Sequence, residues 1–591
     1  MVTVSAVRHT TKMTLLVLAC VLYTGVVMAA SDVADAVMRQ DQAQLAHLIA
    51  ARADVNAAQP DGTTALHWAA YHGDARATAA LLAHGASPSA RTDTGMTPLA
   101  LACEAGNADV VKLLLSSGAD ANQTLQNGET PLMMAARTGK VPVLKLLLAR
   151  GAKIDTREKL RGTTALMWAA ANSNVEAVRF LISKGADLSA RSGTTKPGRQ
   201  PYLAESGRFR IEEFIHGTGQ GGTTVEADAP DAKTSNAQEA AEARAAAHRR
   251  LEAQIAAAKA AIDKFPPAAE HEGRANKQWG GLTPLQFAAR EGNLETVKAL
   301  VEAGADVNET SEYGWTALLV ATQNRSYLMG EYLLDKGADP NIANVGGWTP
   351  LYIATDNRNI EGGDYPTRKP DMDHLDFIKR LILAGAKPNV RMHSSTETRT
   401  VFTHQWLNEE GATPFLRAAQ SGDLVLMKLL MEHGADPSIS TDHKVTPLMV
   451  ASGIGWVEGV TYEWSPQMTY DTVKLLLDLG ADVNAQDTLD GRTALMGAAH
   501  KGRNDVIKLL VQHGADLSIR NIGSRDSIHA LAGVSWQAID YADGLVRVGV
   551  QSAIPHPETA ELLRQMMKER GMPVPPEGRT LASICVTDLC Q

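Results

Sequence analysis

The sequence predicts an all-α repeat solenoid, in which pairs of short helices are joined by β-turn or hairpin loops and interrupted by several long insertions. A short motif, Thr followed by Ala or Pro and then Leu or Phe, recurs with a basic period of 33 residues. Each copy continues into two apolar stretches at helical spacing. Aromatic residues make up only 5% of the chain, which favours close-packed helices over an aromatic-rich β-sandwich.

The first thirty residues have the layout of a secretory signal peptide. A basic stretch with Arg8 and Lys12 precedes an apolar run over residues 13–27, and the small residues Ala29 and Ala30 mark a cleavage site. We therefore expect export to the periplasm or the extracellular space. A retained membrane anchor is the alternative, although the run is shorter than the ~20 residues that a span needs. We expect no membrane span in the rest of the chain.

Residues 31–61 are expected to form an N-terminal capping repeat. The stretch 32–56 has the pattern of two helices but lacks the Thr-Pro-Leu start of the other copies. An atypical unit is normal at the end of a repeat array, because it has a neighbour on one side only.

The repeat motif begins at positions 64, 97, 130, 164, 283, 316, 349, 413, 446 and 493. In the copy at 95–122, Thr97 is placed to cap a helix whose first turn contains Pro98, where the missing N–H costs nothing. That helix stops near Gly106, and a second apolar helix ends at Gly118. Each copy is thus predicted to be one helix pair.

This pattern resembles the ankyrin repeat, with its period of 33, its T-P-L-H-x-A start and its two helices and β-turn. The resemblance covers most of the chain after the signal peptide, with repeat blocks at 62–190 and 281–520 and a degenerate repeat at 521–573. It implies about twelve stacked helix pairs, because one pair cannot bury its apolar face alone. It also implies that a protein partner contacts hairpin tips and the exposed ends of first helices on the concave face.

The largest insertion, at 191–280, separates the two repeat blocks. Its first part is rich in Gly, Thr and Pro, and its second part, 236–265, has high helix propensity. Leu251, Ile255, Ile262 and Phe265 lie near one face of that predicted helix. We expect this face to contact the solenoid or a second copy of the chain.

Two shorter insertions, 359–376 and 453–468, fall between the first and second helix of their repeats, and a third, 391–410, falls on the hairpin side. One intact repeat separates the first two. They are therefore expected on the same edge, roughly 20 Å apart if helix layers lie about 10 Å apart.

The first of these insertions contains an acidic cluster with two interpretations. Asp371, Asp373, His374 and Asp376 resemble metal ligands. Acidic residues after Pro370 are also typical of a helix N-terminus, whose free amides and dipole favour negative charge. We favour the helix start and expect no metal ion and no cofactor.

The other insertion, 453–468, combines carboxylates with aromatic residues. Glycoside hydrolysis uses a pair of carboxylates, and Glu458 and Glu463 are residues of that type. Nothing in the sequence fixes the distance between them. Contact of Trp456, Tyr462 and Trp464 with a sugar or a peptide is the alternative that we prefer. We assign no catalytic residue.

The residue after each turn glycine varies between copies, which suits a surface position. Here Trp315 and Trp348 are expected to stand side by side and face solvent, as aromatic binding anchors. The alternative is that both indoles pack against adjacent hairpins. The full set of predicted partner-binding residues is Trp279, Tyr313, Trp315, Trp348, Gln323, Asn324, Asp356, Asn357, Arg417, Trp456, Tyr462 and Trp464.

The four cysteines have separate interpretations. Cys20 lies in the signal peptide, and Cys103 is expected to be a small buried residue. Cys585 and Cys590 lie in the tail, 574–591, and can form a terminal disulfide in an oxidising compartment or remain two thiols.

The net charge of −9 provides no basic excess to neutralise phosphates, so a nucleic-acid partner is not expected. We predict a non-catalytic protein that binds a protein or peptide, similar in layout to bacterial secreted ankyrin proteins. Two alternatives stay open: an enzyme or carbohydrate-binding protein with a site built from 359–376 and 453–468, and a structural spacer or self-associating scaffold. The sequence leaves the oligomeric state undetermined.

Overall fold

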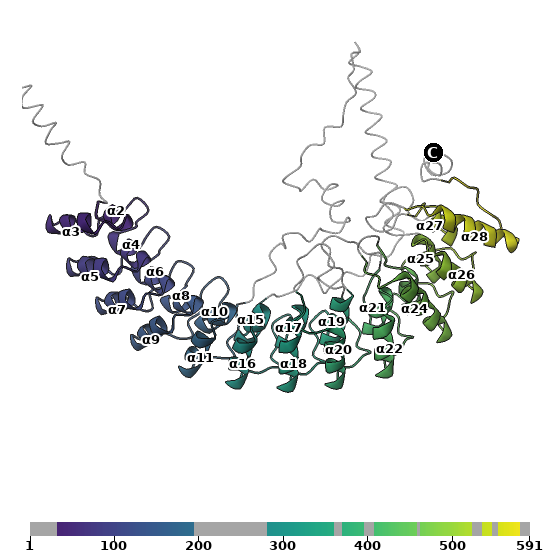
Figure 1. The fold of residues 1–591 in the computed structure, drawn as a ribbon, viewed down its shortest axis with the longest axis horizontal. Coiled ribbons are helices and arrows are strands. Elements are labelled where there is room, and N and C mark those ends of the chain that lie inside the picture. Colours follow the sequence, from purple (N-terminus) through teal and green to yellow (C-terminus); the bar gives the residue numbers. More distant parts are fainter. Residues whose placement is uncertain are drawn as a thin grey trace, which may run out of the picture. The chain divides into compact units, whose positions relative to one another are not determined.

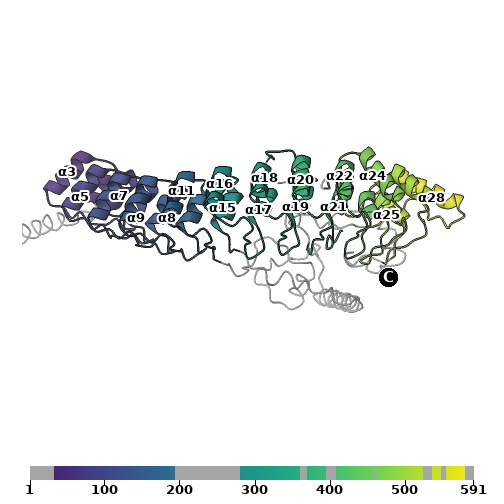
Figure 2. The same cartoon turned by 90° about the horizontal axis from the view of Figure 1, so that it is seen from below.

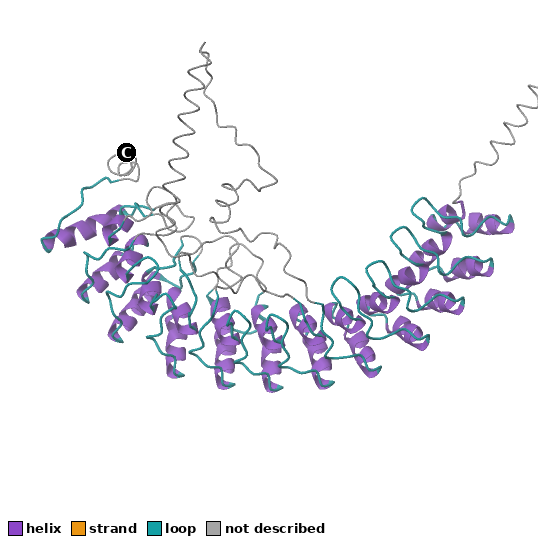
Figure 3. Ribbon diagram, turned by 180° about the vertical axis from the view of Figure 1, so that it is seen from behind, coloured by secondary structure: helices purple, strands orange, loops and turns teal. Residues whose placement is uncertain are grey.

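The structure, a computed structural model, describes residues 32–193, 280–359, 369–394, 407–457, 461–522, 535–546 and 554–579. In these residues the elements are helices, and no strand is present (Figure 3). The signal peptide, the helix at 236–265, Trp279, Glu458, Cys585 and Cys590 lie outside them, so those predictions stay predictions. Within the described ranges, no helix combines the length and the apolar character needed to cross a bilayer.

The described residues fall into two compact units. Unit 1 contains the described residues up to 193 together with 280–312, and unit 2 contains those from 313 onward. We describe each unit by itself.

Unit 1 is a stack of helix pairs, and Figure 1 shows its first helices on one side and its second helices on the other. The first helices α2, α4, α6, α8, α10 and α15 contact one another in that order. The twelve described helices are α2 Asp32–Met38, α3 Gln42–Ala50, α4 Ala65–His72, α5 Ala75–Ala83, α6 Pro98–Ala105, α7 Ala108–Ser116, α8 Pro131–Thr138, α9 Val141–Ala149, α10 Ala165–Ala171, α11 Val175–Ser183, α15 Pro284–Glu291 and α16 Leu294–Glu302.

Unit 2 repeats the same arrangement in its described part. Its first helices α17, α19, α21, α23, α25 and α27 contact one another in order. The helices are α17 Ala317–Gln323, α18 Tyr327–Asp335, α19 Pro350–Arg358, α20 His374–Leu383, α21 Pro414–Gln420, α22 Leu424–Glu432, α23 Pro447–Ser452, α24 Pro466–Asp478, α25 Ala494–His500, α26 Asn504–Gln512, α27 Ala538–Ala542 and α28 Pro557–Glu569. The predicted helix pairs at both ends, α2 with α3 and α27 with α28, are present.

Local sequence explains where these helices start and stop. The Thr97 side chain accepts a hydrogen bond from the Ala100 N–H, Pro98 occupies the first turn, and Gly106 ends α6 with φ of 73°. Asn107 then caps α7 through the Val110 N–H. This confirms the predicted helix pair of the copy at 95–122.

Asparagine side chains join one hairpin to the next. The Asn122 amide donates to the Gly151 carbonyl at 2.9 Å, and its oxygen accepts from the Lys153 N–H at 2.9 Å. Figure 2 shows the hairpin loops of unit 1 projecting from one side of its helices. The same asparagine bridge recurs in unit 2 at Asn341, Asn389 and Asn484.

The helix stack of unit 1 continues past the large insertion. Helix α10 packs on α15, and Ser192 exchanges two hydrogen bonds of 2.9 Å with the backbone of Leu282. The Arg191 guanidinium donates to the Thr310 carbonyl at 2.7 Å. Helices α15 and α16 thus belong with the N-terminal repeats, and this grouping differs from the division that we expected at 191–280.

Candidate interaction surface

One side of each first helix is left free by the stacking of neighbouring repeats. In α4, Ala65, Leu66, His67, Ala69 and Ala70 are buried between repeats. The fourth, seventh and eighth residues after the N-cap lie together on the remaining side, because positions three and four apart share a helix face. We call these three positions, over all first helices, the first-helix face.

The first-helix face is open in unit 1. In α4, α6 and α10 all of its residues are half-buried or exposed. In α8 and α15 only Met134 and Phe287 are buried. The set is Trp68, Tyr71, His72, Leu101, Glu104, Ala105, Met134, Arg137, Thr138, Trp168, Ala171, Asn172, Phe287, Arg290 and Glu291. The sequence predicted contacts at these helix positions in the later repeats, at Gln323, Asn324, Asp356, Asn357 and Arg417. It did not assign the residues of unit 1, although Trp68, Leu101 and Met134 recur at a spacing of 33 residues.

An aromatic group stands on α4 at this face. The Trp68 ring lies 5.9 Å from the Tyr71 ring, edge to face, and 5.9 Å from the His72 ring, stacked. The Trp68 indole N–H donates to the Gln59 side chain at 2.8 Å, which fixes the orientation of the ring. Tyr71 is 59% exposed and is therefore free to meet a partner.

Arginines cover the apolar residues farther along the face. Arg137 lies 5.5 Å from the Trp168 ring centre, contacts the Met134 sulfur at 3.7 Å and pairs with Glu104 at 2.5 Å. Arg290 lies 5.0 Å above the Phe287 ring. Cation–π contacts of this kind hold half-exposed guanidinium groups in fixed positions.

The same face is closed in unit 2. From α19 onward the fourth, seventh and eighth residues after each N-cap are buried, apart from the half-buried Gly544. These buried residues are Ile353, Asp356, Asn357, Arg417, Gln420, Ser421, Val450, Gly453, Ile454, Gly497, His500, Lys501, Tyr541 and Leu545. On α17, Val320, Gln323 and Asn324 are half-buried.

The predicted solvent exposure of Trp348 is wrong. Trp348 is 4% exposed, and its indole N–H donates to the Ser394 carbonyl at 3.2 Å, at the start of the insertion 391–410. Tyr313 is also 4% exposed, and its carbonyl accepts from Val345 of the following hairpin. Trp315 is half-buried, so the two indoles are not a matched exposed pair.

Three predicted polar contact residues are also buried, so their assignment as surface residues is wrong. Arg417 is 1% exposed and its Nε donates to Asp356 Oδ1 at 2.6 Å. The Asn357 amide donates to the Thr322 carbonyl at 2.8 Å. Each of these contacts is made with an adjacent repeat, because a buried charge or amide requires a partner.

The variable position after the turn glycine has two environments. It is half-buried at Thr63, Met96, Glu129 and Leu282 in unit 1. It is buried at Trp348, Ala412 and Arg492 in unit 2, and also at Thr163. Variability at this position therefore does not indicate a free surface in unit 2.

The insertions 359–376 and 453–468 are in direct contact at one point, because the second reaches back across the intervening repeat. The Trp464 indole N–H donates to Asn359 Oδ1 at 2.9 Å. Trp456, Tyr462 and Trp464 are all half-buried, and Tyr462 meets Trp464 edge to face at 5.5 Å. The insertion aromatics thus contact the protein itself.

Glu463 is engaged in ion pairs. Its carboxylate lies 3.1 Å from Lys501 Nζ and 2.7 Å from Arg503 Nη1. Burial favours the neutral form, but Lys501, Thr469 and Arg503 outweigh it and the pKa of Glu463 is lowered. A general acid at neutral pH needs a raised pKa, so this carboxylate does not suit that role.

The acidic cluster 371–376 forms a helix start, as we favoured. The Asp373 side chain caps α20 by accepting from the Leu375 and Asp376 N–H groups. Asp371 accepts from Tyr327 N at 2.7 Å and Leu328 N at 3.1 Å, at the start of α18. No group of three or more metal-ligating side chains occurs among the residues that the structure covers.

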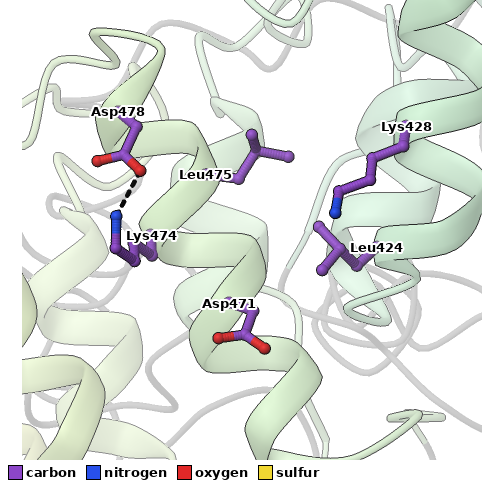
Figure 4. A pocket seen from close by; sticks show the side chains of 6 residues that line it. All are labelled: Leu424, Lys428, Asp471, Lys474, Leu475 and Asp478. Atoms are coloured by element: carbon purple, nitrogen blue, oxygen red, sulfur yellow. Dashed lines mark hydrogen bonds and ion pairs between the residues drawn. The ribbon is translucent and has the colours of Figure 1, made fainter.

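An open surface hollow lies between the second helices α22 and α24 (Figure 4). It is lined by Leu424, Lys428, Asp471, Lys474, Leu475 and Asp478, and Lys474 pairs with Asp478 on its own helix. These six side chains contain no nucleophile paired with a base.

Burial raises the pKa of the Cys103 thiol in unit 1, which agrees with its predicted role as a small buried residue.

Comparison with known families agrees with this geometry. A model for ankyrin repeats in three copies matches residues 33–125, 117–192, 245–344, 285–365 and 466–538, and a model for a single ankyrin repeat matches 410–442 and 443–488. The chain belongs to the ankyrin-repeat family. Ankyrin arrays are usually non-catalytic scaffolds that bind proteins.

Several curated ankyrin proteins resemble part of the chain. Mouse ankyrin repeat domain-containing protein 63 is 38% identical over 109 residues, which is 18% of this chain and 25% of that protein. The mouse B-cell lymphoma 3 protein homolog is 29% identical over 183 residues, 30% of this chain and 34% of that protein. This ankyrin chain therefore matches about a third or less of the length of these relatives.

Among solved structures, the ankyrin repeat domain of human ASB11 aligns with 52% of this chain and 99% of its own length, at 22% identity and a TM-score of 0.35. We draw no conclusion from this alignment.

Proposed function

We propose that this ankyrin-repeat chain is a non-catalytic scaffold that binds a protein or peptide on the first-helix face of unit 1. One observation carries the proposal: the same three helix positions are half-buried or exposed in unit 1, apart from Met134 and Phe287, and are buried from α19 onward in unit 2, apart from Gly544. In unit 2 the insertion 453–468 contacts this face, through Trp456 on His500 and Trp464 on Ser421. Unit 1 instead presents the exposed Tyr71 beside the half-buried Trp68.

The residues on the unit 1 face have the composition of binding anchors. Large aromatic side chains and arginines contribute most of the binding energy of protein interfaces. Tyr71 is such an aromatic residue and Arg290 such an arginine, and each is at least half exposed. Trp68 and Arg137 are fixed by contacts within the unit. Such pre-organisation lowers the entropy cost of association. Trp315, Gln323 and Asn324, which are half-buried, remain proposed contacts.

Site-specific photo-crosslinking tests the proposal. A photoreactive phenylalanine analogue is placed at Tyr71 in the full chain, and the chain is irradiated in its native cells. We expect a discrete crosslinked species from this position, which a Trp68→Ala change weakens. The measurement is the mass and amount of the adduct.

Two matched positions make the result specific. The analogue at Lys112, which is exposed on the second helix α7, and at the buried Trp348 should give no such species. Adducts from Lys112 with none from Tyr71 would show that a partner uses the other side of the array.

We further propose that the chain is exported, as the secretory layout of its first thirty residues supports. Fractionation followed by N-terminal sequencing tests this. A chain outside the cytoplasm that begins near Ala30 agrees with export; a cytoplasmic chain that begins at Met1 contradicts it.

A further inference from the structure

The second insertion of unit 2 touches more repeats than its position in the array requires. Its described residues, 453–457 and 461–468, run from the end of α23 into the first turn of α24; we call them the bridging segment. In a repeat array each unit normally contacts only its neighbours. The bridging segment instead contacts four consecutive repeats, from α19 to α26.

The forward contacts reach the turn between α25 and α26. The Trp456 ring meets the His500 ring at 6.1 Å and lies 5.5 Å from Lys501 Nζ. The Glu463 carboxylate pairs with Lys501 at 3.1 Å and with Arg503 at 2.7 Å. The Lys501 side chain is 5% exposed and that of Glu463 20%, so water screens these charges only weakly.

The backward contacts reach two repeats away. The Trp464 N–H donates to the Ser421 carbonyl at 3.2 Å, in the adjacent repeat. Its indole N–H donates to Asn359 Oδ1 at 2.9 Å, and the Arg358 guanidinium lies 4.4 Å from the ring centre. Both of these residues belong to the repeat of α19 and α20, beyond the repeat of α21 and α22.

Arg358 and Asn359, which contact Trp464, are themselves held in place by other hydrogen bonds. Arg358 Nε donates to Asp423 Oδ2 at 2.7 Å, and the Asp423 side chain is 0% exposed. The Asn359 amide donates to the Thr355 carbonyl at 3.0 Å. Arg417 also donates to the Asn359 carbonyl at 2.8 Å. A displacement of Trp464 would therefore disturb charges that are buried and paired.

The two described stretches of the bridging segment are joined to each other. The Thr461 hydroxyl accepts from the Val457 N–H at 2.9 Å, and the Thr461 N–H donates to the Val457 carbonyl at 2.9 Å. A Cβ on Gly455 would lie 2.8 Å from Leu407 Cβ, so the segment also packs closely on the preceding repeat. The two described stretches thus act as one body.

We propose that the bridging segment is a brace that makes the four repeats from α19 to α26 unfold as one cooperative block. In an array with nearest-neighbour contacts alone, terminal repeats can open one after another. The contact of Trp464 with Asn359 adds a link between two repeats that are not neighbours in the array. Opening of either outer repeat therefore breaks the brace.

Native-state hydrogen exchange of the full chain in low denaturant tests the brace, in the wild type and in Trp464→Ala and Trp464→Phe. Trp464→Ala should speed exchange in α19 and in α25 about tenfold or more, because it removes a hydrogen bond and a cation–π contact. Trp464→Phe keeps a ring under Arg358 and should speed exchange at the same two helices by less. It also provides the readout if the Ala variant does not fold.

Trp168→Ala is the matched control, because the hydrogen bond and ring contact of Trp168 join its own repeat, through Thr163, to the adjacent one, through Arg137. Its effect should stay within α8 to α11. If Trp464→Ala and Trp464→Phe speed exchange only in 461–468 and α24, the brace does not exist and the segment is a local surface contact. If hydrogen exchange is accelerated equally in α19 and α25, the result supports the brace.

Discussion

At the scale of residues, the buried pair of Arg417 and Asp356 illustrates how unit 2 closes its first-helix face. The two side chains are 2% and 6% exposed and lie 2.6 Å apart. Arg417→Ala would leave a buried carboxylate without its counterion, so we expect the free energy of unfolding to fall by roughly 3–5 kcal/mol. Urea unfolding of the full chain measures this.

A half-exposed pair in unit 1 is the control for this prediction. Arg137 and Glu104 are 37% and 45% exposed, so Glu104→Ala should cost less than about 1 kcal/mol. The double variant Arg417→Met, Asp356→Leu should recover most of the stability, because it leaves no unpaired charge. If Arg417→Ala costs no more than Glu104→Ala, the pair is not buried as described.

His500 makes the stability of unit 2 depend on pH. Burial, with a smaller effect of His556, lowers the pKa of His500 from 6.5 to about 4. Between about pH 4 and pH 6.5, the unfolded chain therefore binds a proton at His500 that the folded chain does not bind. Stability is fully present above pH 6.5 and is lost as the pH falls, by about 2 kcal/mol from pH 7 to pH 5 for this group.

Urea midpoints at pH 7 and pH 5 check this dependence. Trp456 and Tyr541 lie against His500; the indole does not titrate, and burial raises the pKa of the Tyr541 hydroxyl farther above this range. A second imidazole, that of His556, lies 2.9 Å from the His500 carbonyl, so the comparison with a His500 variant is needed to assign the effect. His500→Leu should reduce the pH dependence, whereas His433→Gln, at an exposed position, should preserve it. An equal pH dependence in all three proteins would rule out this role for His500.

At the scale of helices, two glycines allow the end of α23 to approach the middle of α25 closely. A Cβ on Gly497 would lie 2.8 Å from the Ile454 nitrogen, and a Cβ on Gly453 would lie 2.5 Å from the Gly497 carbonyl oxygen. Gly497→Ala must push the two helices apart, and overpacking of this kind costs about 1–3 kcal/mol or more.

Gly514→Ala is the comparison, since Gly514 has φ of 91° but open space around it. That change should cost only backbone strain of about 1 kcal/mol. We expect the urea midpoint of Gly497→Ala to lie below that of Gly514→Ala. The reverse order would mean that the helices do not touch at Gly497.

The helices themselves could be predicted, because each carries its own signals. Thr97, Pro98 and Gly106 mark the start and end of α6 without help from distant residues. The glycines at 453 and 497 could not be interpreted in the same way, because the need for them arises from contact between two repeats. Local sequence patterns therefore predict each helix, but which residues pack together between repeats depends on tertiary contacts.

At the scale of the whole molecule, one repeat pattern has two outcomes. Tyr71 and His500 occupy the same position of their repeats, yet Tyr71 is 59% exposed and His500 is 1% exposed. The period of 33 residues predicts the position of each side chain on its helix. It cannot predict which face an insertion will cover, so Trp348, Asp356 and Arg417 were assigned to the surface.

Hydroxyl-radical footprinting of the full chain tests directly whether the first-helix face is open in unit 1 and closed in unit 2. We predict strong oxidation of Tyr71 and Trp68, and protection of His500 and Tyr541, which are 1% and 2% exposed. Equal or stronger oxidation of His500 and Tyr541 would contradict the account.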